Sequence, residues 1–308
     1  TWNRLNMQGL VLFDNMLTGT FPPDLFEGKR QIRYIIVTQN QFTGPLPEII
    51  PQSAIDILYL DMNLFTGTIP QVYFQQDSLT LFGLSDNLLS GSIPDQIRGL
   101  RRLSFFYGSL NSFTGTIVED FSPLRDLKEF LVAGNDLTGT IPSSVASLEL
   151  LTKLSFAANK LVGTLPTELA TMTTLINFNV SNNDLTGSVP TSYVQMTSLA
   201  EFDVSRNNLV GGLEESFCSA AVLSTSIASD CLGNSTAEIT CSCCSACCDD
   251  EVCQNNLDQL CLARSAEFTL APDRNATCDC QDGGVSMKCT DTACESCNLE
   301  GEICAKST

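Results

Sequence analysis

Cysteine is the residue type whose number and spacing most clearly indicate chemistry in this chain. The chain has 308 residues and 15 cysteines, and every cysteine follows residue 217. The densest runs are C-S-C-C-S-A-C-C at residues 241–248 and C-E-S-C at residues 294–297. Such density is typical of a small fold that disulfides hold together. We therefore predict disulfides among Cys218, Cys231, Cys241, Cys243, Cys244, Cys247, Cys248, Cys253, Cys261, Cys278, Cys280, Cys289, Cys294, Cys297 and Cys304.

The same spacings leave a second interpretation open, because paired C-x-x-C motifs can also ligate zinc. Three N-glycosylation sequons favour disulfides, with acceptors at Asn179 (N-V-S), Asn234 (N-S-T) and Asn275 (N-A-T). Glycosylation and disulfides both belong to an oxidising, extracellular compartment. Because the number of cysteines is odd, one thiol is free or pairs outside this chain, and the connectivity stays open.

Catalytic chemistry has little support in the composition. The chain contains no histidine, which removes Ser-His and Cys-His nucleophile pairs and every histidine-based metal site. Asp61, Asp86 and Asp203 lie about two dozen residues or more apart and form no recognisable carboxylate pair. We predict no enzyme, no cofactor and no metal site, although a role for these aspartates toward Ca²⁺ or a cationic ligand stays open.

Charge and hydropathy exclude two further classes of partner. The formal net charge is −19, and such a surface repels phosphate backbones, so we predict no nucleic-acid binding. No run of 18 apolar residues is present, so we predict no membrane-spanning segment in this chain. Thr1 falls inside a repeat, and we expect an N-terminally truncated piece of a longer protein, whose anchorage to a membrane stays open.

Residues 1–217 repeat one pattern. An asparagine recurs with spacings of 25, 23 and then 24 residues, which indicates a solenoid. Apolar residues stand eight, five and three positions before it, as Leu127, Phe130 and Val132 do before Asn135. The last two alternate as in a short, half-buried strand. The nine asparagines are Asn15, Asn40, Asn63, Asn87, Asn111, Asn135, Asn159, Asn183 and Asn207.

Each conserved element of the repeat has a structural role. The asparagine amide can satisfy backbone groups where the chain leaves the strand, and stacked repeats then form an asparagine ladder. The glycine four positions later predicts a turn with positive φ, and the proline of L-T-G-x-I-P predicts the start of the convex segment. Val118 and Glu214 replace that proline. We expect repeat five to tolerate Val118 and Glu214 to mark the end of the array.

The pattern L-x-x-L-x-L-x-x-N-x-L-T-G-x-I-P resembles the plant-specific class of leucine-rich repeats, which occurs in receptor-kinase ectodomains and polygalacturonase-inhibiting proteins. The cysteine-rich tail is similar to tails of diatom and algal leucine-rich-repeat proteins. The resemblance implies an α/β-type solenoid: a curved array of about nine 24-residue repeats with a parallel concave sheet. We expect the solenoid at residues 1–217, a C-terminal cap at 218–240 and a small disulfide-rich, irregular or β tail at 241–308.

In such a solenoid, the residues six, four, two and one positions before the asparagine point outward from the concave sheet. In the first six repeats many of them are large and apolar, and such a strip rarely lies exposed without a partner. Aromatic side chains are also favoured anchors in interfaces. We predict a ligand-binding face that contains Phe13, Tyr34, Ile36, Tyr59, Met62, Phe105, Tyr107 and Leu131.

The leading hypothesis is an extracellular recognition module that binds a protein, peptide or glycan on the concave face. One alternative is a secreted inhibitor of a wall-degrading enzyme, which would use the same face. Another is an ice-binding protein, because threonines recur three and five positions after the asparagine, as in Thr114 and Thr116. Pro45, Val162, Val210 and Gly212 interrupt these columns, and threonine also favours extended backbone in its own right.

Overall fold

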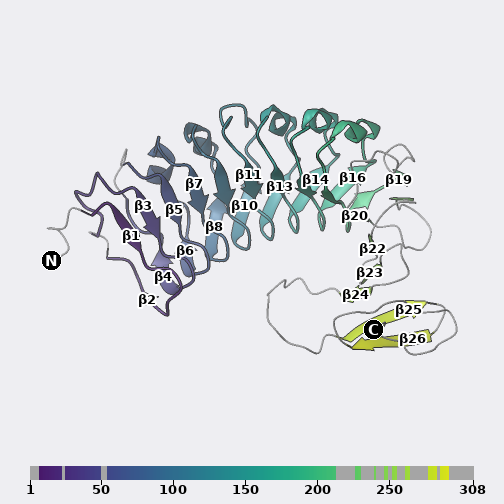
Figure 1. The fold of residues 1–308 in the computed structure, drawn as a ribbon, viewed down its shortest axis with the longest axis horizontal. Coiled ribbons are helices and arrows are strands. Elements are labelled where there is room, and N and C mark those ends of the chain that lie inside the picture. The colour runs from purple at the N-terminus through teal and green to yellow at the C-terminus, as the bar shows by residue number, and fades with distance from the viewer. Residues whose placement is uncertain are drawn as a thin grey trace, which may run out of the picture.

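The protein is a curved solenoid whose repeats stack side by side (Figure 1). A computed structural model describes residues 7–22, 25–49 and 54–212 in full, and beyond them the backbone of several short strands. Each of the nine repeats contributes one three-residue strand to a parallel sheet, which we call the concave sheet. Its repeat strands are β1 (Gly9–Val11), β3 (Tyr34–Ile36), β5 (Ile57–Tyr59), β7 (Leu81–Gly83), β9 (Phe105–Tyr107), β11 (Glu129–Leu131), β13 (Lys153–Ser155), β15 (Asn177–Asn179) and β17 (Glu201–Asp203).

A second parallel sheet of nine strands follows the asparagines, and we call it the side sheet. The predicted glycine lies at or near the end of the strand in the first eight repeats and just after it in the ninth, and it has positive φ in all nine, as the 82° of Gly139 illustrates. Any side chain is strained there, which explains why the sequence keeps glycine. The strands are β2 (Thr18–Gly19), β4 (Gln41–Pro45), β6 (Leu64–Gly67), β8 (Leu88–Ser92), β10 (Ser112–Thr116), β12 (Asp136–Gly139), β14 (Lys160–Gly163), β16 (Asp184–Gly187) and β18 (Asn208–Leu209).

The convex edge carries short 3-10 helices, each of five residues: η2 (Gln71–Gln75), η3 (Asp95–Gly99), η4 (Ser143–Ser147), η5 (Thr167–Thr171) and η6 (Thr191–Gln195). A proline in extended conformation precedes each of them, for example Pro70 with φ of −64°. Because the ring fixes φ, the proline directs the chain into the helix without a side-chain cap. All of the helices in the described part of the chain fall short of the length and apolar character that a bilayer crossing needs.

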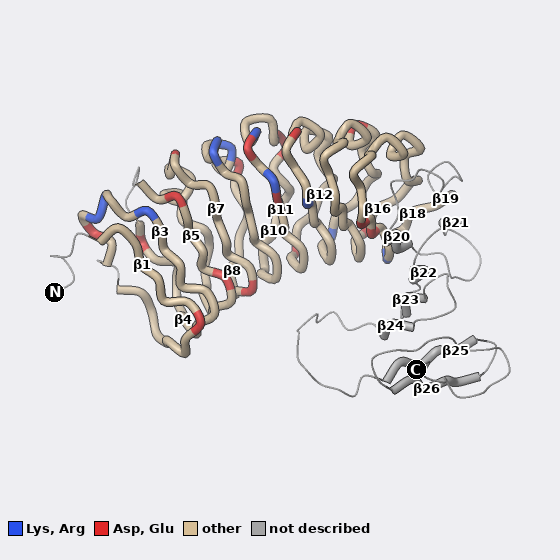
Figure 2. Tube along the Cα trace, in the orientation of Figure 1, with Lys and Arg blue, Asp and Glu red and all other residues tan. Residues whose placement is uncertain are grey.

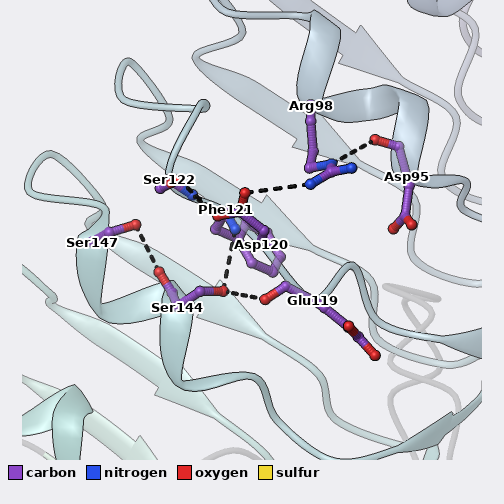
Figure 3. Close-up of polar contacts among 8 residues, drawn as sticks. All are labelled: Asp95, Arg98, Glu119, Asp120, Phe121, Ser122, Ser144 and Ser147. Atoms are coloured by element: carbon purple, nitrogen blue, oxygen red, sulfur yellow. Dashed lines mark hydrogen bonds and ion pairs between the residues drawn. The ribbon is translucent and has the colours of Figure 1, made fainter.

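Repeat five lacks this proline, and polar contacts shape its convex turn instead (Figure 3). Val118 is buried, as the expected tolerance requires. Asp120 Oδ1 accepts hydrogen bonds from Ser122 N at 3.0 Å and Ser122 Oγ at 2.7 Å, and Asp120 Oδ2 lies 3.3 Å from Arg98 Nη1 of the preceding repeat. From the following repeat, Ser144 Oγ donates to Glu119 O at 2.7 Å. Contacts to both neighbours thus replace the constraint of the proline ring.

The asparagine ladder is present. Asn135 Nδ2 donates to Val132 O at 3.1 Å in its own repeat and to Gly108 O at 3.0 Å in the preceding one. Its Oδ1 accepts from Phe113 N at 2.9 Å. Each such amide therefore joins two repeats, and the same three contacts recur at Asn40, Asn63, Asn87, Asn111, Asn159, Asn183 and Asn207.

The core runs through the middle of the stack and consists of the predicted inward positions. Rings of neighbouring strands pack on one another, with centroids 5.6 Å apart for Phe82 and Phe106 and 5.2 Å apart for Phe106 and Phe130. These residues occupy the central position of their strands, so the flanking residues of each strand face outward. The predicted register and the solenoid fold are confirmed.

Beyond the repeats the structure gives only backbone strands: β19 (Gly211–Gly212), β20 (Ser226–Ser229), β21 (Ile239–Thr240), β22 (Ala246–Cys248), β23 (Val252–Gln254), β24 (Cys261–Ala263), β25 (Thr277–Asp282) and β26 (Val285–Thr290). Strand β20 continues the concave sheet by pairing in parallel with β17. The antiparallel register sets Cys278 opposite Cys289 and Cys248 opposite Cys253. The predicted disulfides, Glu214, Asn234 and Asn275 all fall outside the residues whose side chains are described.

Candidate functional site

The predicted ligand-binding residues lie on the concave sheet and in the turns that follow its strands. Along the column four positions before the asparagine, the register aligns Ile36 with Tyr59, and Tyr107 with Leu131, with Gly83 between the two tyrosines. In the column six positions before it, Tyr34 and Phe105 lie three strands apart, and Ile57 and Leu81 lie between them. The structure thus brings six of the eight residues onto one continuous surface.

The remaining two residues, Phe13 and Met62, lie in the turns after β1 and β5. They are 56% and 49% exposed, more than any of the six strand residues. Met62 also has a positive φ of 54°, as do other residues directly before the asparagine. Only repeat six has glycine there, Gly134. The turn position is therefore constrained by backbone conformation, which the sequence analysis did not anticipate.

Tyr59 and Gly83 make a close approach at the centre of the strip. A Cβ atom added to Gly83 would lie 2.4 Å from Tyr59 Cδ2 and 2.6 Å from Asp61 Oδ1. The tyrosine ring and the carboxylate therefore occupy space that a side chain at Gly83 would fill. Sequence reasoning omitted Gly83, although its position in the same column as Tyr59 and Tyr107 could have revealed it.

Tyr107 is held by a carboxylate from the next strand. Its hydroxyl donates to Glu129 Oε2 at 3.0 Å, and Glu129 Oε1 lies 3.2 Å from Lys153 Nζ. Burial raises the pKa of the Tyr107 phenol, and the hydrogen bond to Glu129 and the charges of Glu129 and Asp61 raise it further. Burial and Asp61 likewise raise the pKa of Tyr59. Both rings are therefore neutral and keep electron-rich faces at physiological pH.

Asp61 is the ionisable group that the strip surrounds. It is 7% exposed, and its Oδ1 accepts a hydrogen bond from Ser85 N at 2.9 Å. Burial raises the pKa of its carboxyl to about 7, and the charge of Asp86 adds to this, while the Ser85 hydrogen bond opposes it. The side chain is thus close to half protonated at neutral pH.

The last three repeats present a polar surface instead. Asp203 Oδ1 accepts from Ser205 N at 3.0 Å and from Ser205 Oγ at 2.6 Å. Burial raises its pKa, but Ser205, Ser181 and the charge of Arg206 all oppose the shift. Asn179, the sequon residue described here, lies in β15, and its Oδ1 accepts from Ser181 N at 3.0 Å. Glycosylation at Asn179 therefore stays a prediction.

Metal binding finds no site in the part of the chain that the structure describes. Across residues 7–22, 25–49 and 54–212, no three cysteine or acidic side chains converge in a way that could hold an ion. In particular, Asp61, Asp86 and Asp203 are not brought together, since Asp203 lies six repeats from Asp61. The surface instead offers aromatic faces, hydrogen-bonding groups and one nearly enclosed carboxylate, which suit recognition of a ligand.

Solved structures with the same architecture identify the fold. The chain matches the plant peptide hormone receptor RGFR1, solved in complex with RGF2, at 30% identity and a TM-score of 0.66, over 77% of this chain and 36% of that one. It matches the Arabidopsis receptor kinase HAESA, solved with the peptide hormone IDA and the co-receptor SERK1, at 26% identity and a TM-score of 0.69, over 81% of this chain and 44% of that one. This chain has a plant-type leucine-rich-repeat fold.

The leucine-rich-repeat chain spans less than half the length of these two receptor chains. A plant ice-binding protein shares the fold at 24% identity and a TM-score of 0.57, over 67% of this chain and 66% of that one. The sequence matches no protein-family model and no curated protein.

Proposed function

We propose that the leucine-rich-repeat solenoid is an extracellular recognition module that binds a peptide or protein segment on its concave face, without catalysis. The observation that carries the proposal is the strip of apolar and aromatic side chains on adjacent strands from β3 to β11. Five of them, Ile36, Tyr59, Phe105, Tyr107 and Leu131, are half-buried, so they are held in place while their outer faces stay accessible.

Two further observations support a peptide-binding concave face. The described surface of the last repeats is polar, so the concave sheet has one end suited to an apolar ligand and one that is not. RGFR1, a plant peptide hormone receptor solved with RGF2, and HAESA, solved with the peptide hormone IDA, share the fold at 30% and 26% identity. Tyrosine and phenylalanine also bury large areas at small entropic cost, which favours them as anchors.

A peptide-display library panned against the secreted protein tests the proposal. Selected peptides should bind the unaltered chain and lose at least tenfold in affinity for Tyr59→Asp and Tyr107→Asp. The matched control is Val162→Asp, because Val162 is a 45% exposed apolar residue on the side sheet. Thermal unfolding should be nearly unchanged in all three variants. Peptides that bind the tyrosine variants as well as the parent would refute a concave-face site.

Ice binding is a second candidate, which the side sheet favours. The hydroxyl residues three and five positions after the asparagine are mostly exposed, and strands in this sheet repeat at about 4.8 Å with alternate residues about 6.8 Å apart. The methyl groups of Thr116, Thr140 and Thr164 lie within 3.0 Å of the place that a Cβ on the glycine of the next repeat would take, so the repeats stack closely here. Such a flat array could match a crystal lattice.

Thermal hysteresis of the purified protein tests this candidate separately. Activity that Thr116→Tyr and Thr140→Tyr abolish, and that Tyr107→Asp leaves intact, would assign ice binding to the side sheet. A protein that neither shapes ice crystals nor lowers their growth temperature would eliminate the candidate. Neither result bears on peptide binding, because the two surfaces belong to different sheets.

A further inference from the structure

The concave sheet holds a group of side chains that peptide binding through apolar contacts alone does not explain. We call it the Asp61 site, and it consists of Tyr59, Asp61, Gly83, Tyr107 and Glu129. Asp61 is its central member, because the Tyr59 ring and the Asp61 carboxylate share the space above Gly83 and because its charge acts on both tyrosines.

The structural task of Asp61 does not need a charge. Its Oδ1 accepts from the N–H of the equivalent residue one repeat along, Ser85, at 2.9 Å. Ser85 performs the same task with its hydroxyl, accepting from Ser109 N at 3.2 Å. Ser109 in turn accepts from Ala133 N at 3.1 Å. A neutral serine therefore satisfies this contact in the next two repeats, so the repeat fold does not require the negative charge of Asp61.

That charge is also poorly compensated. Ser85 N–H is its hydrogen-bond donor, and within residues 7–22, 25–49 and 54–212 no lysine or arginine forms an ion pair with it. Asp203 provides the contrast, because Ser205 donates to it through both its backbone N–H and its hydroxyl, and the charge of Arg206 acts on it. A carboxylate that is 7% exposed and lacks a cation costs free energy, which a cation from outside would recover.

The surroundings suit such a cation. Tyr59 and Tyr107 lie in register on the strands on either side of Gly83, and the Tyr59 ring lies over Gly83 beside the Asp61 carboxylate. Aromatic faces attract an ammonium or guanidinium group within about 6 Å of the ring centre. Glu129 fixes Tyr107 through its hydroxyl at 3.0 Å, which leaves the ring in place before any ligand arrives.

Long-range charge favours the same kind of partner. The chain carries 35 acidic and 16 basic residues, and acidic positions occur along the whole solenoid (Figure 2). A surface of this sign steers cationic ligands toward it and repels anionic ones. The local and the overall electrostatics therefore agree.

We propose that Asp61, flanked by Tyr59 and Tyr107, binds a lysine or arginine side chain of the peptide or protein ligand. The inference rests on the proposed recognition function and deepens it, because it assigns a charge to one residue of the ligand. The aromatic strip then supplies apolar contact on either side, and Asp61 fixes the register of the ligand along the sheet.

The test uses peptides selected from the display library against the full secreted chain. Selected sequences should share one lysine or arginine at a fixed position. Asp61→Ser keeps the acceptor for Ser85 N–H and removes the charge, so it should fold normally and bind the selected peptide at least tenfold more weakly. Replacing the cationic residue of the peptide by norleucine should weaken binding to the parent chain and make no further difference to Asp61→Ser.

Asp86→Asn is the matched control, since Asp86 is an exposed acid in the following turn, and it should change the affinity less than twofold. Peptides that bind the parent chain without a fixed cation, and bind Asp61→Ser equally well, would overturn the inference and leave the recognition function standing. A library that yields no peptide sensitive to Tyr59→Asp or Tyr107→Asp would overturn both.

Discussion

The ring of Tyr59 occupies the space in which a side chain at Gly83 would lie. An added Cβ would come within 2.4 Å of its Cδ2 atom, well inside van der Waals contact. Gly83 has ordinary extended backbone in β7, so the absence of a side chain serves the neighbouring ring and not the local conformation.

Gly83→Ala should displace Tyr59 and the Asp61 carboxylate while leaving the fold intact. The contacts it violates involve side-chain atoms that can rotate away, so we expect a stability change within about 1 kcal/mol. Affinity for selected peptides should nevertheless fall at least tenfold, as for Tyr59→Asp. Unchanged affinity, measured by titration calorimetry, would mean that the ring position is unimportant for binding.

Loss of a ladder asparagine should destabilise the chain because it leaves buried backbone groups of two repeats without hydrogen-bond partners. Asn135→Ala is expected to cost about 1–3 kcal/mol in the free energy of unfolding. Asn15→Ala is the matched control: Asn15 is exposed and donates only to Leu12 O and Phe13 O of its own repeat. Urea unfolding that shows equal losses for both variants would contradict the double role of the ladder.

Stability should depend on the protonation of Asp61. Its carboxyl pKa is about 7 in the folded chain, against about 3.9 in an unfolded one. Between about pH 4 and about pH 7 the folded chain therefore holds a proton that the unfolded chain releases, so stability falls as the pH rises through this window. The charged group that faces Asp61 is Asp86, with Tyr59, Tyr107 and Glu129 nearby, and none of these offers a cation.

Asp61→Asn isolates this contribution, since the amide keeps an acceptor for Ser85 N–H. The variant should be the more stable chain at pH 8, by up to about 4 kcal/mol, and should match the parent near pH 4. Thermal unfolding across the range measures the difference. An identical pH profile for the two chains would show that Asp61 titrates normally.

The cysteine-rich tail should be oxidised when the chain passes through a secretory pathway. With 15 cysteines, at most seven bridges can form within the chain. Intact mass under denaturing, non-reducing conditions should show these bridges and a mass loss on glycosidase treatment from Asn234 or Asn275. Free thiols, bound zinc and no glycan would instead indicate an intracellular metal-binding tail.

The periodicity of the sequence was enough to predict the solenoid, its register and the asparagine ladder. This worked because each of these features depends on residue types that recur at one position, such as the buried series that contains Phe106 and Phe130. The predicted outward columns also contain every strand residue of the candidate site. Repetition makes one repeat a guide to all of the others.

The properties of single positions could not be read in the same way. The enclosure of Asp61 depends on how Tyr59 packs over Gly83, a contact between two neighbouring repeats. The positive φ of Met62 and Leu110 reflects a turn that the fold imposes on residues with no preference for it. Side-chain packing across repeats decides these features, and no single repeat encodes it.

The convex turn of repeat five is the part of the convex edge whose geometry depends on an exposed ion pair, between Arg98 and Asp120. Before each of the helices η2 to η6 a proline ring sets the direction of the chain, and salt has no effect on a covalent constraint. At repeat five the contact between Arg98 and Asp120 is exposed to solvent, so mobile ions screen it. In concentrated salt this turn, between β10 and η4, should therefore loosen more than the convex turns that a proline precedes.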